Sequence, residues 1–258
     1  AEEETATGRD AQIEAARAAF YSGFVAEAID NWMREACVSD ATGDRRKGVL
    51  TGQDMAGWSA SYEPPVDTTY HGWQVFKPGF WSQGPVQLQS LNLLADPSLP
   101  PEGSAAFVHR VTEAMKLAFA DREANYGDAS DMATAQAQLL SPAYAETRRA
   151  LITDTASHDQ RPGALAGHEA LAQAAIARAA RTVTAPAGAG AGEPTMAHLS
   201  EKRGDTVHID VIDRWGNMVS ATPSGGWLQS SPVVPGLGMP LNTRAQMFWL
   251  DAGLPTSL

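Results

Sequence analysis

The junction at residue 206 carries the residue types that best fit a chemical reaction. Residues 182–205 are small, polar and rich in glycine and proline, and they end at Thr206, where polar and apolar residues begin to alternate. A threonine hydroxyl at such a junction can attack the peptide bond before it, and the resulting ester can hydrolyse. The new N-terminal threonine then carries both a nucleophile and a base, because a free α-amine has a pKa of about 8. An ordinary boundary between a loop and a strand has the same pattern, so both interpretations stay open on these residues alone.

Other patterns in the sequence do not predict a site. Gly188, Gly190 and Gly192 lack the G-x-G-x-x-G spacing, the preceding strand and the following helix of a dinucleotide site. Ser59 lacks the second glycine of a G-x-S-x-G nucleophile elbow. The six histidines show no H-E-x-x-H spacing, and one cysteine, Cys37, is too few for a cysteine-based zinc site. We therefore expect neither a metal nor a cofactor.

The composition argues against two classes of partner. The 258 residues include 19 Lys and Arg against 30 Asp and Glu, which gives a net charge of −11. An acidic chain repels a phosphate backbone, so we expect no general binding of nucleic acid. No run of about 18 apolar residues is present, so we expect no membrane-spanning segment.

Helical periodicity dominates the first 180 residues. Residues 11–37 predict two helices joined at Gly23, and residues 49–62 predict a short helix capped by Thr51 with Asp54 three positions on. Residues 41–48 predict a loop. Further helices are predicted over residues 87–94, 105–123, 142–153 and 164–181. In the second of these, the predicted buried stripe consists of Phe107, Val111, Met115 and Ala118.

Strand patterns occupy less of the chain and gather after residue 205. One strand is predicted over residues 69–76 and another near 246–250. Residues 206–213 and 217–222 alternate with period two around the turn DRWGN, which predicts a hairpin. Helices followed by hairpins indicate an α+β protein.

Several blocks of sequence resemble the γ-glutamyltransferase (γ-glutamyltranspeptidase) family. Residues 206–208, VIDRWGNMVSATPS and SSPVVPGLGMPLNTRAQMFWLD are similar to the start of the small subunit of that family. Four upstream blocks are similar to its large subunit, in the family's order: LTGQDMAGW, YHGWQVFKPG, WSQGPVQLQSLNLL and EAMKLAFADREANYGD. The resemblance covers nearly the whole chain.

The resemblance implies the fold and the maturation of an N-terminal-nucleophile (Ntn) hydrolase. That fold is an αββα sandwich of two sheets flanked by helices, of which this chain would hold a part. The resemblance implies cleavage of a precursor between Asp205 and Thr206. Residues 1–205 would form a mainly helical large-subunit portion that ends in a mobile tail, residues 182–205, and residues 206–258 would begin the small subunit. The active form would be a heterodimer of the two cleavage products.

The resemblance also implies an activity. Thr206 would be the nucleophile, forming an acyl-enzyme from a γ-glutamyl amide such as glutathione and passing the acyl group to water, an amino acid or a peptide. Ser224 stands where the family has a threonine that hydrogen-bonds the nucleophile, and it keeps the hydroxyl. One alternative is an acylase of the same family acting on glutaryl or cephalosporin-type side chains. Another, from a different class, is a truncated relative without catalysis.

The chain departs from the family at the substrate-binding positions. Family members hold the γ-glutamyl group with an Asn, with a Gln or Glu, and with an Asp that pairs with the α-ammonium, and these positions are Gly226, Arg244 and Met247 here. Asn242, of the family's LN pair, is retained. The family's upstream arginine and its downstream pair of glycines for the oxyanion fall outside these 258 residues. We therefore expect this chain alone to show little turnover.

The resemblance favours a periplasmic or extracellular location, with the cytoplasm as the alternative. The sequence determines neither the acyl donor and acceptor nor the choice between hydrolysis and transfer.

Overall fold

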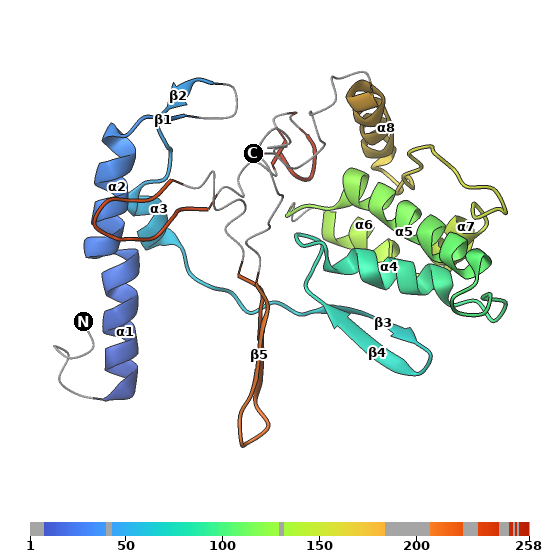
Figure 1. Ribbon diagram of the computed structural model, residues 1–258, viewed down its shortest axis with the longest axis horizontal. Helices are drawn as coiled ribbons and strands as arrows, with labels where there is room; N and C mark the ends of the chain where they lie inside the picture. The colour runs from blue at the N-terminus through green and yellow to red at the C-terminus, as the bar shows by residue number, and fades with distance from the viewer. Residues whose placement is uncertain are drawn as a thin grey trace. The chain divides into compact units, whose positions relative to one another are not determined.

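The computed structural model describes residues 8–39, 43–128, 132–183, 207–223, 232–242, 248–249, 251 and 253–257, and its elements form two compact units (Figure 1). Unit 1 comprises Ala1–Ser61 and Pro194–Gln246, and unit 2 comprises Tyr62–Glu193 and Met247–Leu258. These units differ from the two portions predicted from the sequence, 1–205 and 206–258. That boundary concerns maturation, and it stays a prediction.

Unit 1 begins with the predicted pair of helices, α1 (Arg9–Tyr21) and α2 (Phe24–Glu35). The turn between them is tight at Gly23, where an added Cβ would lie 3.0 Å from the backbone of Ala19. A larger residue would therefore push the helices apart. The pair of helices around Gly23 is confirmed.

The short helix α3 (Gly52–Gly57) confirms the predicted cap. The Asp54 N–H donates to Thr51 Oγ1 at 3.2 Å, and the Thr51 N–H donates to Asp54 Oδ2 at 2.9 Å. This reciprocal pair satisfies two N–H groups that a helix start leaves without partners. The prediction of a plain loop over residues 41–48 is wrong in part, because β1 (Val38–Ser39) and β2 (Arg45–Arg46) pair as a short antiparallel ribbon.

A loop from late in the chain completes the core of unit 1. Val234 is 1% exposed and packs with Ala26 and Ile29 of α2 and with Met55 of α3. Within this loop the Leu241 N–H donates to the Pro232 carbonyl at 2.9 Å, which closes it into a compact turn. Unit 1 therefore joins the beginning of the chain to residues that follow position 206.

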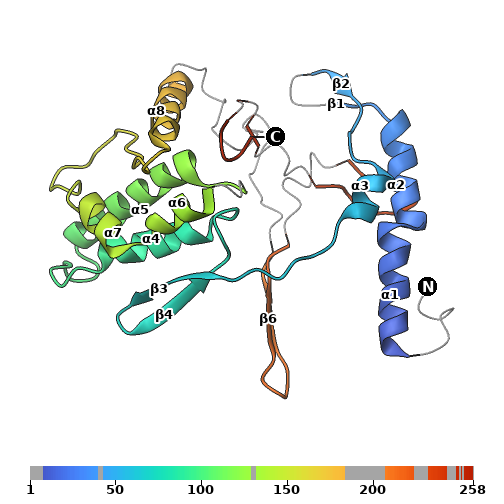
Figure 2. The ribbon, with the colours of Figure 1, turned by 180° about the vertical axis from the view of Figure 1, so that it is seen from behind.

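Unit 2 is mainly helical, with one hairpin beside its helices (Figures 1 and 2). Its elements are β3 (Val66–Tyr70), β4 (Trp73–Lys77), α4 (Gly84–Leu94), α5 (Ala105–Asn125), α6 (Ala133–Gln138), α7 (Pro142–Arg149) and α8 (Glu169–Val183). Helices α4 and α5 pack together over Leu93, Leu94 and Leu117. Late in the chain Trp249 pairs with Ser257 in an isolated bridge, and residues 246, 247 and 250 of the last predicted strand lie outside the described part.

The single strand predicted over residues 69–76 is wrong, because the chain turns at its centre. His71 and Gly72 have φ angles of 48° and 83°, and Tyr70 pairs with Trp73 across them. Two positive φ angles in a two-residue loop are typical of the hairpin turn that matches strand twist. Residues 66–77 therefore form a hairpin that packs on α4.

The buried face of α5 differs from the predicted stripe. Ala118 is buried as expected, but Met115 is 44% exposed, and the buried face includes the side chains of Glu113, Asp121 and Asn125. Two carboxyl groups on a core face need partners, since an unpaired charge out of water costs several kcal/mol. Other elements of unit 2 supply those partners.

Asp121 collects donors from three parts of unit 2. Its carboxylate accepts from Gln89 Nε2 of α4 at 2.9 Å, from Arg148 Nη2 of α7 at 3.1 Å and from the Gly163 N–H at 2.6 Å. Burial raises the pKa of Asp121, and the guanidinium of Arg148 opposes that rise. The contacts fix α4, α7 and the loop at residue 163 around one point on α5.

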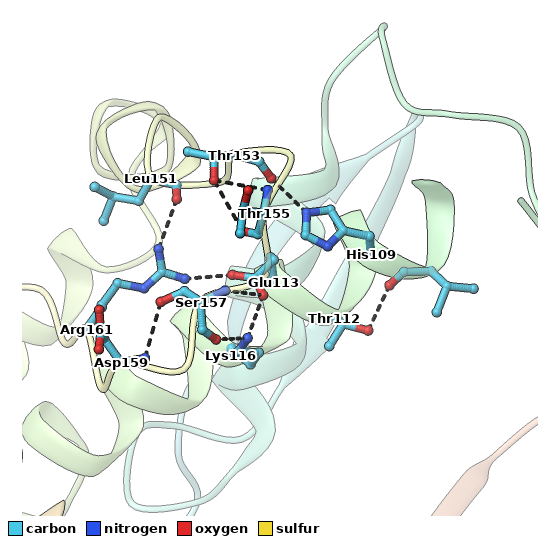
Figure 3. A network of polar contacts seen from close by, with 11 residues as sticks. His109, Thr112, Glu113, Lys116, Leu151, Thr153, Thr155, Ser157, Asp159 and Arg161 are labelled. Atoms are coloured by element: carbon cyan, nitrogen blue, oxygen red, sulfur yellow. Dashed lines mark hydrogen bonds and ion pairs between the residues drawn. The ribbon is translucent and has the colours of Figure 1, made fainter. Parts of the chain in front are cut away.

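The carboxylate of Glu113 binds donors from the chain that follows α7 (Figure 3). Its carboxylate accepts from Lys116 Nζ at 2.5 Å, from Arg161 Nη2 at 2.7 Å and from the Ser157 N–H at 3.3 Å. Burial alone would raise the pKa of Glu113, but the contacts with Lys116, Ser157 and Arg161 hold that pKa below its usual 4.5. The segment from Leu151 to Arg161 is thereby tied to α5, with Arg161 also donating to the Leu151 carbonyl.

Replacing Asp121 by alanine should destabilise unit 2 strongly. The substitution leaves the buried guanidinium of Arg148 without its carboxylate, which costs about 3–5 kcal/mol. Urea unfolding followed by circular dichroism would measure this loss. The control is Glu146→Ala, an exposed position on α7, which should change stability by less than about 0.5 kcal/mol. A loss below about 1 kcal/mol for Asp121→Ala would contradict the role of this carboxylate.

Acid should remove the contribution of Glu113 to stability. Since its pKa is lowered in the folded state, the ionised group stabilises the fold above the unfolded value near 4.5, and this is lost as the pH falls through the lower folded-state pKa. The difference in free energy of unfolding between the parent and Glu113→Gln should therefore be largest at neutral pH and shrink below pH 4.5. Urea titrations at a series of pH values measure it, and a difference that stays constant with pH would contradict the assignment.

Candidate active site

The hairpin after residue 206 is the described part of the predicted site. Strand β5 (Ile209–Ile212) pairs antiparallel with β6 (Met218–Ala221), with Ile209 opposite Ala221. Figures 1 and 2 show its two strands from opposite sides. The turn is closed by the Asp213 N–H, which donates to the Asn217 carbonyl at 3.0 Å. This confirms the predicted hairpin around DRWGN.

The pairing extends beyond the two strands at the open end of the hairpin. The Val207 N–H donates to the Pro223 carbonyl at 3.2 Å. Proline has no N–H, so this pair has one backbone hydrogen bond in place of two. One step closer to the turn, His208 and Thr222 face each other. They form a non-hydrogen-bonded pair, the kind in which facing side chains come closest together.

Four polar side chains share one face of the hairpin near this end. His208 Nδ1 lies 2.7 Å from Thr222 Oγ1, and His208 Nε2 lies 3.0 Å from Asp210 Oδ2. Ser220 Oγ lies 3.5 Å from His208 Nε2. The opposite face is apolar and exposed, with Val207, Ile209, Val211 and Val219.

A neutral His208 with its proton on Nε2 fits these contacts. Because an ionised carboxylate only accepts hydrogen bonds, Nε2 in this tautomer donates to Asp210, and Nδ1 accepts from the Thr222 hydroxyl. An imidazole held in this way can orient a hydroxyl group or exchange a proton with it. Sequence reasoning weighed His208 only as a metal ligand and missed this cluster. The signal was the pattern H-x-D facing S-x-T, which becomes readable once the hairpin register is known.

Most of the predicted site residues lie outside the described residues. They are Asp205, Thr206, Ser224, Gly226, Arg244 and Met247. Asn242 is described and is exposed, directly after the closed loop at Leu241. The roles assigned to all of these residues stay predictions, and the described chain comes as near as Val207, which follows Thr206, and Pro223, which precedes Ser224.

The described residues contain neither a cluster suited to a metal ion nor a helix suited to span a membrane. In the described ranges, no group of three or more His, Cys, Asp and Glu side chains is arranged to hold a metal ion. Of the helices that the structure describes, none combines the length and the apolar character needed to cross a membrane.

The sequence of this chain matches a model of a protein family. The model, described as gamma-glutamyltranspeptidase, matches residues 11–256. This match covers most of both units and includes the junction at residue 206.

Curated relatives include an acylase and a glutathione hydrolase. The acylase ACY 1 proenzyme of Pseudomonas sp. (strain SE83) is 29% identical over 234 residues, which cover 89% of this chain and 34% of the relative. The glutathione hydrolase proenzyme of Pseudomonas aeruginosa is 26% identical over 244 residues, which cover 91% of this chain and 35% of the relative. The chain thus spans about a third of the length of these relatives.

Solved structures resemble the chain along its length. A structure of the protein LmbA2991, in a variant with one threonine changed to alanine, has a TM-score of 0.83 at 49% sequence identity. The match covers 100% of this chain and 41% of the LmbA2991 chain. The cephalosporin acylase from Bacillus halodurans has a TM-score of 0.65 at 26% identity, over 96% of this chain and 38% of its own.

Proposed function

The chain belongs to the gamma-glutamyltranspeptidase family, within the Ntn hydrolases, and on this premise we propose that it is part of a self-processing amidohydrolase or acyltransferase whose nucleophile is Thr206. The observation that carries the proposal is the register of the β5–β6 hairpin. Ile209 faces Ala221, and the Val207 N–H binds the Pro223 carbonyl. The described pairing therefore ends at the residue after Thr206 and at the residue before Ser224, which supports a role for these two neighbours at one end of the hairpin.

The family resemblance implies a contact between the hydroxyl groups of Thr206 and Ser224, and we propose that this chain makes it. The described pairing supports the proposal as far as the neighbouring residues, because the Val207 N–H donates to the Pro223 carbonyl. Serine keeps the hydroxyl that the contact needs.

The proposed reaction forms and then breaks one ester. After cleavage between Asp205 and Thr206, the free α-amine of Thr206 takes the hydroxyl proton while Thr206 Oγ1 attacks the carbonyl carbon of an amide. The C–N bond of the amide breaks, and its amine leaves with the proton. Water or an amine then attacks the ester, which releases the acyl group and restores the hydroxyl.

The donor can be γ-glutamyl or glutaryl, and the sequence favours the second. The relatives of this chain include a glutathione hydrolase and a cephalosporin acylase, so proteins named for both kinds of donor are similar to it. Met247 replaces the family carboxylate that pairs with the α-ammonium of a γ-glutamyl group, and Arg244 adds a positive charge nearby. A donor without the ammonium avoids both penalties, and Arg244 can pair with its free carboxylate.

Contacts within each unit support a heterodimer of the two cleavage products. In unit 1, Val234 is buried against Ile29 and Met55, which precede the proposed cut. In unit 2, the guanidinium of Arg178 lies 4.9 Å from the ring centre of Trp249. Residues that follow the cut are thus packed into both units, so we propose that the products stay associated after cleavage.

Thr206→Ala should abolish self-cleavage. Without the hydroxyl no ester can form, so the protein should remain one chain, whereas Thr206→Ser should still divide at a lower rate. Intact-mass spectrometry of the protein from its complete reading frame measures the products. A Thr206→Ala protein that is still cleaved before residue 206 would refute the assignment of Thr206 as the nucleophile. A parent protein that is never cleaved would favour the alternative of a non-catalytic relative.

Matched anilides test the donor. We expect a higher kcat/KM for a glutaryl than for a γ-glutamyl anilide. Met247→Asp should raise kcat/KM for the γ-glutamyl substrate about 10–100-fold, the effect of one charged hydrogen bond. Met247→Leu is the control and should change neither value. The proposal would be contradicted by a parent that strongly favours the γ-glutamyl anilide and shows no gain in Met247→Asp. The α-ammonium would then be bound by another carboxylate, and Asp251 is the candidate nearest in sequence.

A further inference from the structure

We propose that His208 is a positioning residue for the reaction at the open end of the β5–β6 hairpin: with Asp210 on one ring nitrogen and Thr222 on the other, it fixes the spacing of the two strands beside position 206. The inference rests on the proposed function and adds a residue to its site. The roles proposed for Thr206 and Ser224 stay as they are.

The backbone alone holds the open end weakly. Pro223 removes one of the two hydrogen bonds of the last described pair and leaves the bond from the Val207 N–H at 3.2 Å. The next pair, His208 and Thr222, is of the kind that forms no backbone hydrogen bonds. The contact of 2.7 Å between His208 Nδ1 and Thr222 Oγ1 is therefore a second cross-strand bond at this end.

Asp210 determines which nitrogen of His208 faces Thr222. It lies two residues along β5, on the same face, with its carboxylate 3.0 Å from Nε2. By accepting a hydrogen bond from Nε2–H, Asp210 leaves Nδ1 as the acceptor for the Thr222 hydroxyl, which then points toward β5. Thr222 is then held in one rotamer two residues before Ser224.

Because His208 and Asp210 are exposed, substituting His208 should affect the reaction rate much more than the free energy of unfolding. The side chains of His208 and Asp210 are 55% and 63% exposed, and since even exposed ion pairs contribute little to stability, this exposed hydrogen bond should contribute little as well. Positioning has a steeper effect, because a displacement of about 1 Å at a reacting group can lower a rate about 100-fold. His208 substitutions should therefore slow the reaction in a protein that folds normally.

Two amide substitutions separate the two contacts of the imidazole. In His208→Asn the amide replaces Nδ1 and can still bond Thr222, whereas in His208→Gln it replaces Nε2 and can still bond only Asp210. We expect kcat and the self-cleavage rate to fall about 10–100-fold in His208→Gln, to stay within about threefold of the parent in His208→Asn, and KM to change little in both. Thr222→Val should behave like His208→Gln, and Thr222→Ser like the parent.

The measurements are self-cleavage followed by gel densitometry, kcat and KM with an anilide donor, and the melting temperature, all on the protein from its complete reading frame. Equal rates in the parent, His208→Gln and Thr222→Val would overturn the inference and leave the proposed function intact. Equal losses in His208→Asn and His208→Gln would also overturn it, because they would show that contact with Thr222 is not what matters. A parent that neither divides nor turns over a donor would overturn the proposed function and this inference with it.

Discussion

The fold of unit 2 depends on the need to pair two carboxylates that α5 turns toward the core. A helix with Glu113 and Asp121 on its buried face is not stable there by itself, since each charge taken out of water costs several kcal/mol. The partners come from α4, from α7 and from the loop that follows it. Apolar contacts between α4 and α5 are not directional, whereas each hydrogen bond of the carboxylates joins a defined atom of a neighbour to α5.

This constraint explains where sequence analysis succeeded and where it failed. Local signals were sufficient for the Gly23 turn, for the Thr51 cap and for the hairpin around DRWGN, because each depends on residues close in sequence. The buried face of α5 was mispredicted because an amphipathic pattern assigns carboxylates to solvent. Their true environment depends on Arg148 and Arg161, which lie far along the chain. The turn at His71 was missed because a non-glycine residue there adopts a positive φ.

The candidate site shows the same division between local and distant information. The residues around position 206 allowed a nucleophile but left an ordinary boundary between a loop and a strand equally open, and period-two alternation predicted the strands of the hairpin that follows. The relation of His208 to Thr222 could not be read from either strand alone, since it depends on which residue faces which across the hairpin. Substrate positions such as Arg244 and Met247 follow an irregular, proline-rich loop, where neither periodicity nor capping predicts geometry.

The burial of Val234 against Ile29 affects how the chain folds during synthesis. These two residues of one core are about 200 positions apart, so at ribosomal speeds of about 5–20 residues per second the first helices wait about 10–40 seconds for their partner. Most of the core of unit 2 lies in one continuous stretch and is complete much earlier. The apolar side of α2 that carries Ile29 is therefore without this core partner until Val234 has been synthesised.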